Sequence, residues 1–267
     1  MTWISRQFLL TVLAVAAAMG AAAPAVASTA GFGDWAAVVV AGDNRAHDGK
    51  HSEAFDNARR DVSAELEQLG FAADNVDQFS IEPDRHPETH PGPASAQNIA
   101  NALWDLSNRT TGGCLLYFSS HGSPQGLILG ETVLQPGELA TMTENACGDR
   151  PTVVIVSACY SGVFVPALAA PNRLVITAAR SDRTSFGCGQ DDKYPYFDTC
   201  VLSRMPVAGS FPNLADAVRN CVSRRERETG MRPPSEPQVA VGAEVAAALP
   251  VWGGMAARQP SGAIGVP

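Results

Sequence analysis

The chain has 267 residues, of which 45% are hydrophobic and 17% charged, which is enough for one sizeable hydrophobic core. Its formal net charge is −8, and its Lys and Arg residues do not gather into a basic patch. Nucleic acid and anionic membrane surfaces are therefore excluded as expected partners.

The N-terminal segment has the order of a secretory signal. Arg6 precedes an apolar stretch over residues 8–23, and Ala25-Val26-Ala27 stands just before Ser28. A membrane anchor is the alternative, but the stretch is short and mostly alanine. We therefore predict a signal peptide over residues 1–27 and a secreted or periplasmic protein with no stable membrane anchor after cleavage.

Strand-like and helix-like segments alternate after this region, which predicts an α/β fold with a mostly parallel sheet between helices on both faces. In chain order, the predicted elements are a strand at 35–42, a helix at 55–69, a strand at 76–81, a Pro-rich loop at 83–93, a helix at 95–108, a strand at 114–120, a hairpin at 126–134, a helix at 136–146, strands at 152–158 and 173–179, a helix around 214–222, and an edge strand at 238–242. We expect one domain over residues 28–249 and a poorly ordered tail over 250–267.

Two reactive side chains follow neighbouring strands of this predicted sheet. The strand at 114–120 runs into His121 and Gly122, and the strand at 152–158 runs into Cys159. Ligands of parallel sheets bind beyond the carboxyl ends of the strands, so the histidine and the thiol are expected at one edge. An imidazole and a helix N-terminus near a thiol raise its thiolate fraction. The pattern favours nucleophilic catalysis, and a buried structural cysteine beside an ordinary turn is the alternative.

Four blocks of sequence resemble a known family. "YFSSHGS" (117–123) and "VSACYSG" (156–162) resemble the His-Gly and Ala-Cys blocks of the caspase-like cysteine peptidases, in particular the legumain family. "TAARSDRTSFGC" (177–188) resembles the next block of that family, and "AGDN" (41–44) resembles the strand end that supplies an asparagine. The resemblance covers about residues 36–222 and implies a caspase-like three-layer sandwich around a mostly parallel six-stranded sheet.

The resemblance also implies a division of roles. Cys159 is then the nucleophile and His121 the general base that later protonates the leaving amine. The N–H groups of Gly122 and Cys159 stabilise the oxyanion, and Asn44 orients the histidine. No cofactor is implied, and the substrate is a peptide or protein that is cleaved after Asn or, less readily, Asp.

The substrate pocket is likewise implied only by resemblance. Its walls correspond to Lys50, His51, Ser157, Ser185 and Asp198. The arginine of the family appears here as Lys50, and its glutamate before Ala-Cys appears as Ser157, so one acidic wall residue is missing. The placement of Asp198 requires a gap in the spacing.

Two other functions remain open from the sequence. A transpeptidase or transamidase uses the same dyad and thioester, and a non-catalytic relative keeps the fold as a binding module. His47 and His51 have a four-residue spacing, but Gly49 lies between them, so we expect no metal site.

The six cysteines can be disulfide-bonded, free or catalytic. In an exported protein all of them are disulfide candidates, but one working thiol leaves an odd number, and hence at least one further free cysteine. Cys188 and Cys200 are the first candidate pair because they lie in one short loop. Cys114 and Cys221 are expected in the core.

Overall fold

A seven-stranded sheet forms the centre of the computed structural model, which describes residues 31–253. The strand order is β10-β9-β8-β4-β1-β2-β3, and every neighbouring pair runs parallel except β9 and β10. The strands are β1 (Ala36–Ala41), β2 (Val76–Ser80), β3 (Gly92–Pro93), β4 (Cys114–Ser119), β8 (Thr152–Ser157), β9 (Arg173–Thr177) and β10 (Gln238–Val241). The predicted signal peptide and residues 254–267 of the predicted tail lie outside the described residues.

The central strands are apolar at nearly every position because both faces of the sheet are covered. In β1, Ala37 and Val39 point into one hydrophobic cluster, whereas Val38 and Val40 point into the other. This alternation of side chains along a strand divides the core into two layers, one on each face.

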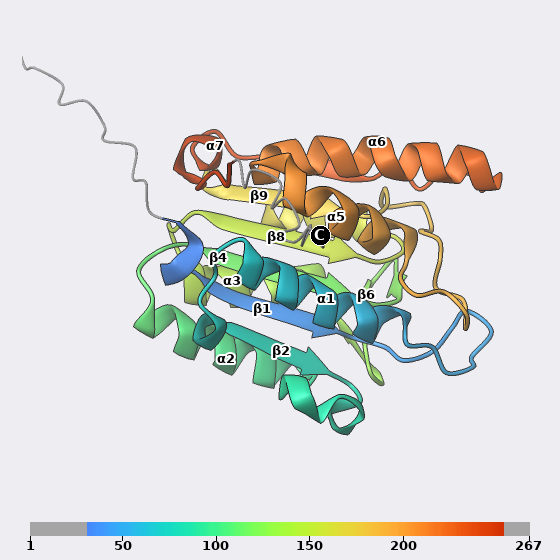
Figure 1. The fold of residues 1–267 in the computed structure, drawn as a ribbon, viewed down its shortest axis with the longest axis horizontal. Coiled ribbons are helices and arrows are strands. Elements are labelled where there is room, and N and C mark those ends of the chain that lie inside the picture. Colours follow the sequence, from blue (N-terminus) through green and yellow to red (C-terminus); the bar gives the residue numbers. More distant parts are fainter. Residues whose placement is uncertain (1–30, 254–267) are drawn as a thin grey trace, which may run out of the picture.

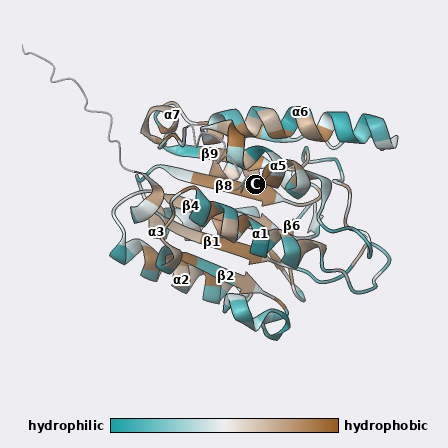
Figure 2. Ribbon diagram, viewed as in Figure 1, coloured by the Kyte–Doolittle hydropathy of each residue, from teal (hydrophilic) through white to brown (hydrophobic). Residues whose placement is uncertain are grey.

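Helices cover both faces, so the predicted three-layer arrangement is confirmed (Figure 1). One face is covered by α1 (Ala54–Gln68), α5 (Tyr196–Ala208), α6 (Phe211–Thr229) and the short α7 (Val245–Ala248). The other is covered by α2 (Ala96–Arg109), α3 (Pro136–Cys147) and α4 (Val165–Leu168). Figure 2 shows apolar central strands and polar residues along the outside of α6. Among residues 31–253, no helix is both long and apolar enough to cross a membrane.

Polar caps fix where several helices begin. The Ser95 hydroxyl accepts the N–H of Asn98 at the start of α2, and Ser210 does the same for Asn213 at the start of α6. Gly230 follows α6 with a φ of +73°, a left-handed conformation that glycine adopts without a steric penalty. These local signals explain why the predicted helix positions are close to the observed ones.

A small second sheet follows β4 directly. It consists of β5 (Gly122–Ser123), β6 (Gly126–Leu129) and β7 (Thr132–Leu134), in the order β5-β6-β7. The predicted hairpin at 126–134 is confirmed as β6 and β7, which turn through Gly130 and Glu131. Since β5 begins one residue after His121, this sheet fixes the direction in which the chain leaves the histidine.

Several observed elements were not predicted, among them β3, α4, α5 and α7. The sheet has seven strands rather than six because the two-residue β3 pairs with β2 inside the Pro-rich loop. Helix α5 was not predicted, since it buries Asp198 and contains Pro206 near its end. Trp252, beyond the predicted domain end at residue 249, packs its ring on Phe32 and Phe211, so the packed domain continues at least to this residue.

Two disulfides join elements of the core. Cys114 in β4 is bonded to Cys147 at the end of α3, and Cys200 in α5 is bonded to Cys221 in α6. The predicted Cys188–Cys200 pair is therefore wrong, because the side chain of Cys200 faces α6 and not the loop before α5. Cys188 and Cys159 are both free, which confirms the expected second free cysteine.

Removing the Cys114–Cys147 bridge by a double substitution to Ala is expected to lower the free energy of unfolding by about 3–4 kcal/mol, because the bridge restricts the unfolded chain over a separation of 33 residues. The matched variant without Cys200–Cys221, with a separation of 21, is expected to lose a similar amount, within about 1 kcal/mol. Denaturant unfolding of the two variants checks this. A loss below about 1 kcal/mol in either variant contradicts it.

Candidate active site

One cavity brings together the histidine and the cysteine that follow β4 and β8. It has a volume of about 520 Å³, and His121, Gly122 and Cys159 all line it. The pairing of β4 with β8 continues to the end of both strands, where the N–H of Ser120 donates to the carbonyl of Ser157 at 3.0 Å. The sheet register thus places the two reactive side chains at the same edge, as the sequence predicts.

The imidazole of His121 is held by the main chain and by an aromatic ring. Its Nε2 lies 2.8 Å from the carbonyl oxygen of Arg45, and the ring of Phe55 packs against it edge-on with centroids 5.0 Å apart. A carbonyl oxygen can only accept, so Nε2 carries the proton and Nδ1 of the neutral ring remains a proton acceptor. The histidine is therefore held in the tautomer that a general base requires.

The predicted partner of His121, Asn44, does not fill this role. The carbonyl of Arg45, one residue further along, makes the contact, and the hydrogen bonds of Asn44 are main-chain bonds to Asp43 and Ser52. The loop after β1 turns so that a carbonyl, not an amide side chain, faces the imidazole.

A buried carboxylate shapes this loop, and it was not predicted. Asp43 is 3% exposed and accepts the main-chain N–H groups of Asn44 and Arg45 at 2.8 and 3.1 Å. The same carboxylate accepts from the Arg45 guanidinium, which extends to the carbonyl of Gly130 and to Glu131 in the turn between β6 and β7. Asp43 thus fixes the residue whose carbonyl holds His121.

The thiol of Cys159 is hydrogen-bonded to the main chain of Ser185. The Ser185 N–H donates to Sγ at 3.2 Å, and Sγ lies 3.7 Å from the carbonyl oxygen of the same residue. Burial raises the pKa of Cys159, and the Ser185 N–H offsets only part of that effect. Burial thus disfavours the thiolate, which opposes the expected rise in its fraction.

The chain turns sharply at the thiol. Tyr160 has a φ of +56°, a left-handed conformation that is unusual for a residue with a side chain, and its N–H donates to the carbonyl of Arg183 at 2.7 Å. The hydroxyl of Ser161 donates to the carbonyl of Ala158 at 2.7 Å. These contacts hold Cys159 at the tip of a tight turn between β8 and the following 3₁₀ helix (Ser161–Phe164).

Gly122 lies directly against the backbone of Cys159. A Cβ atom at this position would be 2.0 Å from the carbonyl oxygen of Cys159, so only glycine fits here. The N–H of Ile128 donates to the carbonyl of His121, which makes that pair hydrogen-bonded and leaves Gly122 and Leu127 as the non-bonded pair of the antiparallel ladder. The Gly122 N–H is therefore free to bind an anion in the cavity.

Of the five predicted pocket residues, only Ser185 lines the cavity. Lys50 is exposed and paired with Asp48, and the imidazole of His51 is bonded to Glu82 at 2.9 Å. Both side chains therefore have partners outside the cavity.

The other two predicted pocket residues lie in the core. Ser157 is 1% exposed and donates its hydroxyl to the carboxylate of Asp198 at 2.6 Å. Asp198 also accepts from the hydroxyls of Tyr117 and Ser119. Burial raises the pKa of Asp198 to about 6, an effect that these hydroxyls partly offset. The carboxyl group thus ties Ser119, two residues before His121, to Ser157, two residues before Cys159.

A second hollow adjoins the cavity and was missed from the sequence. It has a volume of about 360 Å³ and shares His47, Thr184, Ser185 and Cys188 with the first. Asp192, Tyr196 and Met231 are among its other walls. Most of these residues lie in the long loop between β9 and α5, where no hydrophobic periodicity marks a functional segment.

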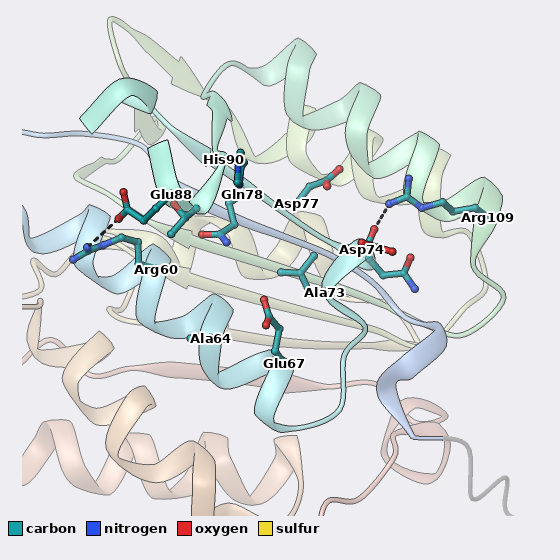
Figure 3. Close-up of a pocket in the computed structure, with 13 residues that line it drawn as sticks. Arg60, Ala64, Glu67, Ala73, Asp74, Asp77, Gln78, Glu88, His90 and Arg109 are labelled. Carbon is teal, nitrogen blue, oxygen red and sulfur yellow. Dashed lines mark hydrogen bonds and ion pairs between the residues drawn. The ribbon is translucent and has the colours of Figure 1, made fainter. Parts of the chain in front are cut away.

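A hollow larger than these two lies elsewhere. It has a volume of about 1000 Å³, and Figure 3 shows Arg60, Glu67 and Asp77 around it, at α1 and the outer side of β2. It shares no lining residue with the cavity of Cys159. Among residues 31–253, no three His, Cys, Asp or Glu side chains gather as ligands for a metal ion.

Comparisons with known proteins agree with the fold. Residues 97–205, which include His121 and Cys159, match the Peptidase C13 family. Caspase-1 from Spodoptera frugiperda has a similar structure, with a TM-score of 0.58 at 15% sequence identity over 80% of this chain and 89% of that chain. No curated protein sequence matches the chain.

The substitution Asp198→Asn is expected to change how stability depends on pH. Because the pKa of Asp198 rises from 3.8 to about 6 on folding, the folded protein binds an extra proton between these values. Its stability therefore falls as pH rises through this range, by about 3 kcal/mol for a shift of about 2 units. Asn cannot titrate. The free energy of unfolding of the variant minus that of the native protein should therefore increase by about this amount between pH 4 and pH 7.

Denaturant unfolding of both proteins at pH 4, 5, 6 and 7 measures this difference. Asp192→Asn is the matched control, because it removes a partly exposed carboxylate from the same region. A difference between Asp198→Asn and the native protein that stays constant with pH contradicts the assignment.

Proposed function

We propose that this chain is a legumain-like cysteine peptidase of the caspase fold, which hydrolyses peptide bonds after Asn or Asp with Cys159 as nucleophile and His121 as general base. The observation that carries the proposal is the shared cavity, in which a thiol, an imidazole with a free Nδ1 and an unpaired glycine N–H face one space. These are the groups that acyl transfer through a thioester requires.

The first half of the reaction forms the thioester. Nδ1 of His121 takes the proton of the Cys159 thiol, and the sulfur attacks the peptide carbonyl carbon. The oxyanion accepts hydrogen bonds from the N–H groups of Gly122 and Cys159, each of which contributes about 10²–10³ in rate. The carbon–nitrogen bond then breaks, and the departing amine takes the proton from His121.

The second half releases the acid. His121, neutral again, takes a proton from water, and the resulting hydroxide attacks the thioester carbonyl. The carbon–sulfur bond breaks, and the proton returns from His121 to Cys159. Because burial raises the pKa of the Cys159 thiol, a proton acceptor such as His121 is needed to form the attacking thiolate.

The adjoining hollow supports the proposed preference for Asn. A carboxamide both donates and accepts hydrogen bonds, and the hollow offers the carboxylate of Asp192 as acceptor and the hydroxyls of Thr184 and Ser185 as donors. An ionised Asp side chain would meet the charge of Asp192, which favours Asn over Asp at neutral pH. The pocket proposed here replaces the walls that were expected at Lys50, His51, Ser157 and Asp198.

We also propose that the protein is exported. The order of residues 1–27 is that of a signal peptide, and four cysteines of the described chain are paired in disulfides, which persist in oxidising compartments.

The nucleophile and the preference are tested together. The mature protein, Cys159→Ala and His121→Ala are each incubated with fluorogenic peptides that differ only in the residue before the scissile bond. We expect turnover with Asn above Asp, and none with Lys or Leu. Cys159→Ala should have no detectable turnover, and His121→Ala should lose at least about 10² in kcat because proton transfer is removed.

The same assay separates the other functions. An amide product formed with an added amine in place of the acid indicates a transpeptidase. Cys159→Ala with native turnover, or no turnover in any of the three proteins together with a Cys159 that resists iodoacetamide, contradicts the proposal and favours a binding module.

The carboxylate of Asp43 generates a prediction about histidine positioning. Asp43→Asn weakens the hold on the Arg45 guanidinium and main chain, and so loosens the carbonyl that orients His121. We expect kcat to fall about 10–100-fold with little change in KM.

Glu131→Gln is the matched control, because Glu131 is 92% exposed and lies 3.6 Å from the same guanidinium. It should retain native kcat, since an exposed ion pair contributes little. Equal kcat values for the two variants, with unchanged melting temperatures, contradict the positioning role of Asp43.

A further inference from the structure

A second free thiol lies in the cavity of Cys159 and has no part in the reaction described above. All six cysteines of the chain fall within residues 31–253, and four of them are paired. The remaining two, Cys159 and Cys188, both line the same cavity of about 520 Å³. The chain thus leaves unpaired the two thiols that face one space.

The backbone brings Cys188 within reach of Cys159. The N–H of Ser185 donates to Sγ of Cys159 at 3.2 Å, and Cys188 follows only three residues later, a distance of about 10 Å at full extension. Gly187, with a φ of +86°, and Gly189 flank Cys188 in a loop without regular secondary structure. Glycines on both sides allow the backbone to turn toward Cys159 once the bonds of Gly189 to Ser52 and Asp192 break.

Electrostatics agrees with this proximity. Burial raises the pKa of Cys188 to about 11, and the negative charge of a Cys159 thiolate is the second cause, ahead of Asp192 and Asp43. Ionisation of Cys159 therefore disfavours ionisation of Cys188.

We propose that Cys188 is a resolving thiol, which converts a mixed disulfide between Cys159 and a low-molecular-weight disulfide into an internal Cys159–Cys188 bridge. This chemistry goes beyond the proposed peptidase reaction and requires only the thiol pair, not turnover. The co-reactant is a small organic disulfide, such as those of an oxidising compartment.

The two steps balance. Cys159 gives its proton to His121, and its sulfur attacks one sulfur of the small disulfide, which breaks the S–S bond and releases one small thiol that takes up the proton. Cys188 then loses its proton to water, and its sulfur attacks Sγ of Cys159, which breaks the mixed bond and releases the second small thiolate, which takes up a proton from water. Two protein thiols are oxidised, and one small disulfide is reduced to two thiols.

The bridge has a direct consequence for the site. It removes the nucleophile from the cavity reversibly, and a dithiol reductant restores it. It also prevents a stable adduct from remaining on Cys159.

Oxidised glutathione serves as the probe. The folded, full-length mature protein and the variants Cys188→Ser and Cys159→Ala are incubated with it, quenched with acid and measured by intact-mass spectrometry without reduction. Native protein is expected to lose the mass of two hydrogen atoms, and peptide mapping should place the new bridge between Cys159 and Cys188. Cys188→Ser should instead retain a glutathione adduct on Cys159, and Cys159→Ala should gain no bridge.

Three results overturn the proposal. They are a stable adduct on Cys159 in the native protein at the level seen in Cys188→Ser, a new bridge that involves other cysteines, and a native protein that gains neither bridge nor adduct. Circular dichroism of each variant checks that its fold is intact. Cys188→Ala is a second variant without this thiol and should behave like Cys188→Ser. The readout is mass, so a failure of the peptidase proposal leaves it unaffected.

Discussion

A single buried carboxyl group connects the two strand ends on which the site depends. The carboxylate of Asp198 in α5 accepts hydrogen bonds from the hydroxyls of Ser119 in β4 and Ser157 in β8. It also accepts from the hydroxyl of Tyr117, two residues before Ser119 on the same face of β4. Burying this group raises its pKa and so opposes folding at neutral pH, an effect that the three hydroxyls and a main-chain hydrogen bond partly offset. Because the reactive residues follow these serines by two positions, the separation of thiol and imidazole is set from within the core, below the cavity.

The reactive groups themselves are held mainly by the backbone. The imidazole of His121 is oriented by the carbonyl of Arg45, and the thiol of Cys159 is bonded to the N–H of Ser185. Backbone groups cannot be replaced by substitution, so the site depends on loop conformations, which in turn rest on contacts such as those of Asp43.

The sequence predicts those features that local patterns determine. Apolar runs and helix caps predict the positions of most elements. Because ligands of parallel sheets bind beyond the carboxyl ends of the strands, the sequence also predicts that His121 and Cys159 lie close together, and both line one cavity. Prediction from sequence fails where a contact depends on distant residues, as for the pairing of His51 with Glu82. The contact of His121 with the carbonyl of Arg45 could not be predicted, because every residue has such a carbonyl. The burial of Ser157 could have been predicted, because side chains alternate along a strand and Ser157 therefore lies on the same face as Ile155, which packs toward α5.

The loop between β9 and α5 joins two properties of the site that are otherwise separate. Its residues Thr184, Ser185 and Asp192 form walls of the hollow beside Cys159, and Cys188 lies between them. Selection of a substrate side chain requires this loop to be held still, whereas the approach of Cys188 to Cys159 requires it to move. In the structure the segment is anchored on both sides of Cys188, because the Ser185 N–H donates to Sγ of Cys159 and Gly189 is bonded to Ser52 and Asp192. A substrate that fills the hollow would hold the same segment away from Cys159, so substrate binding and bridge formation exclude each other.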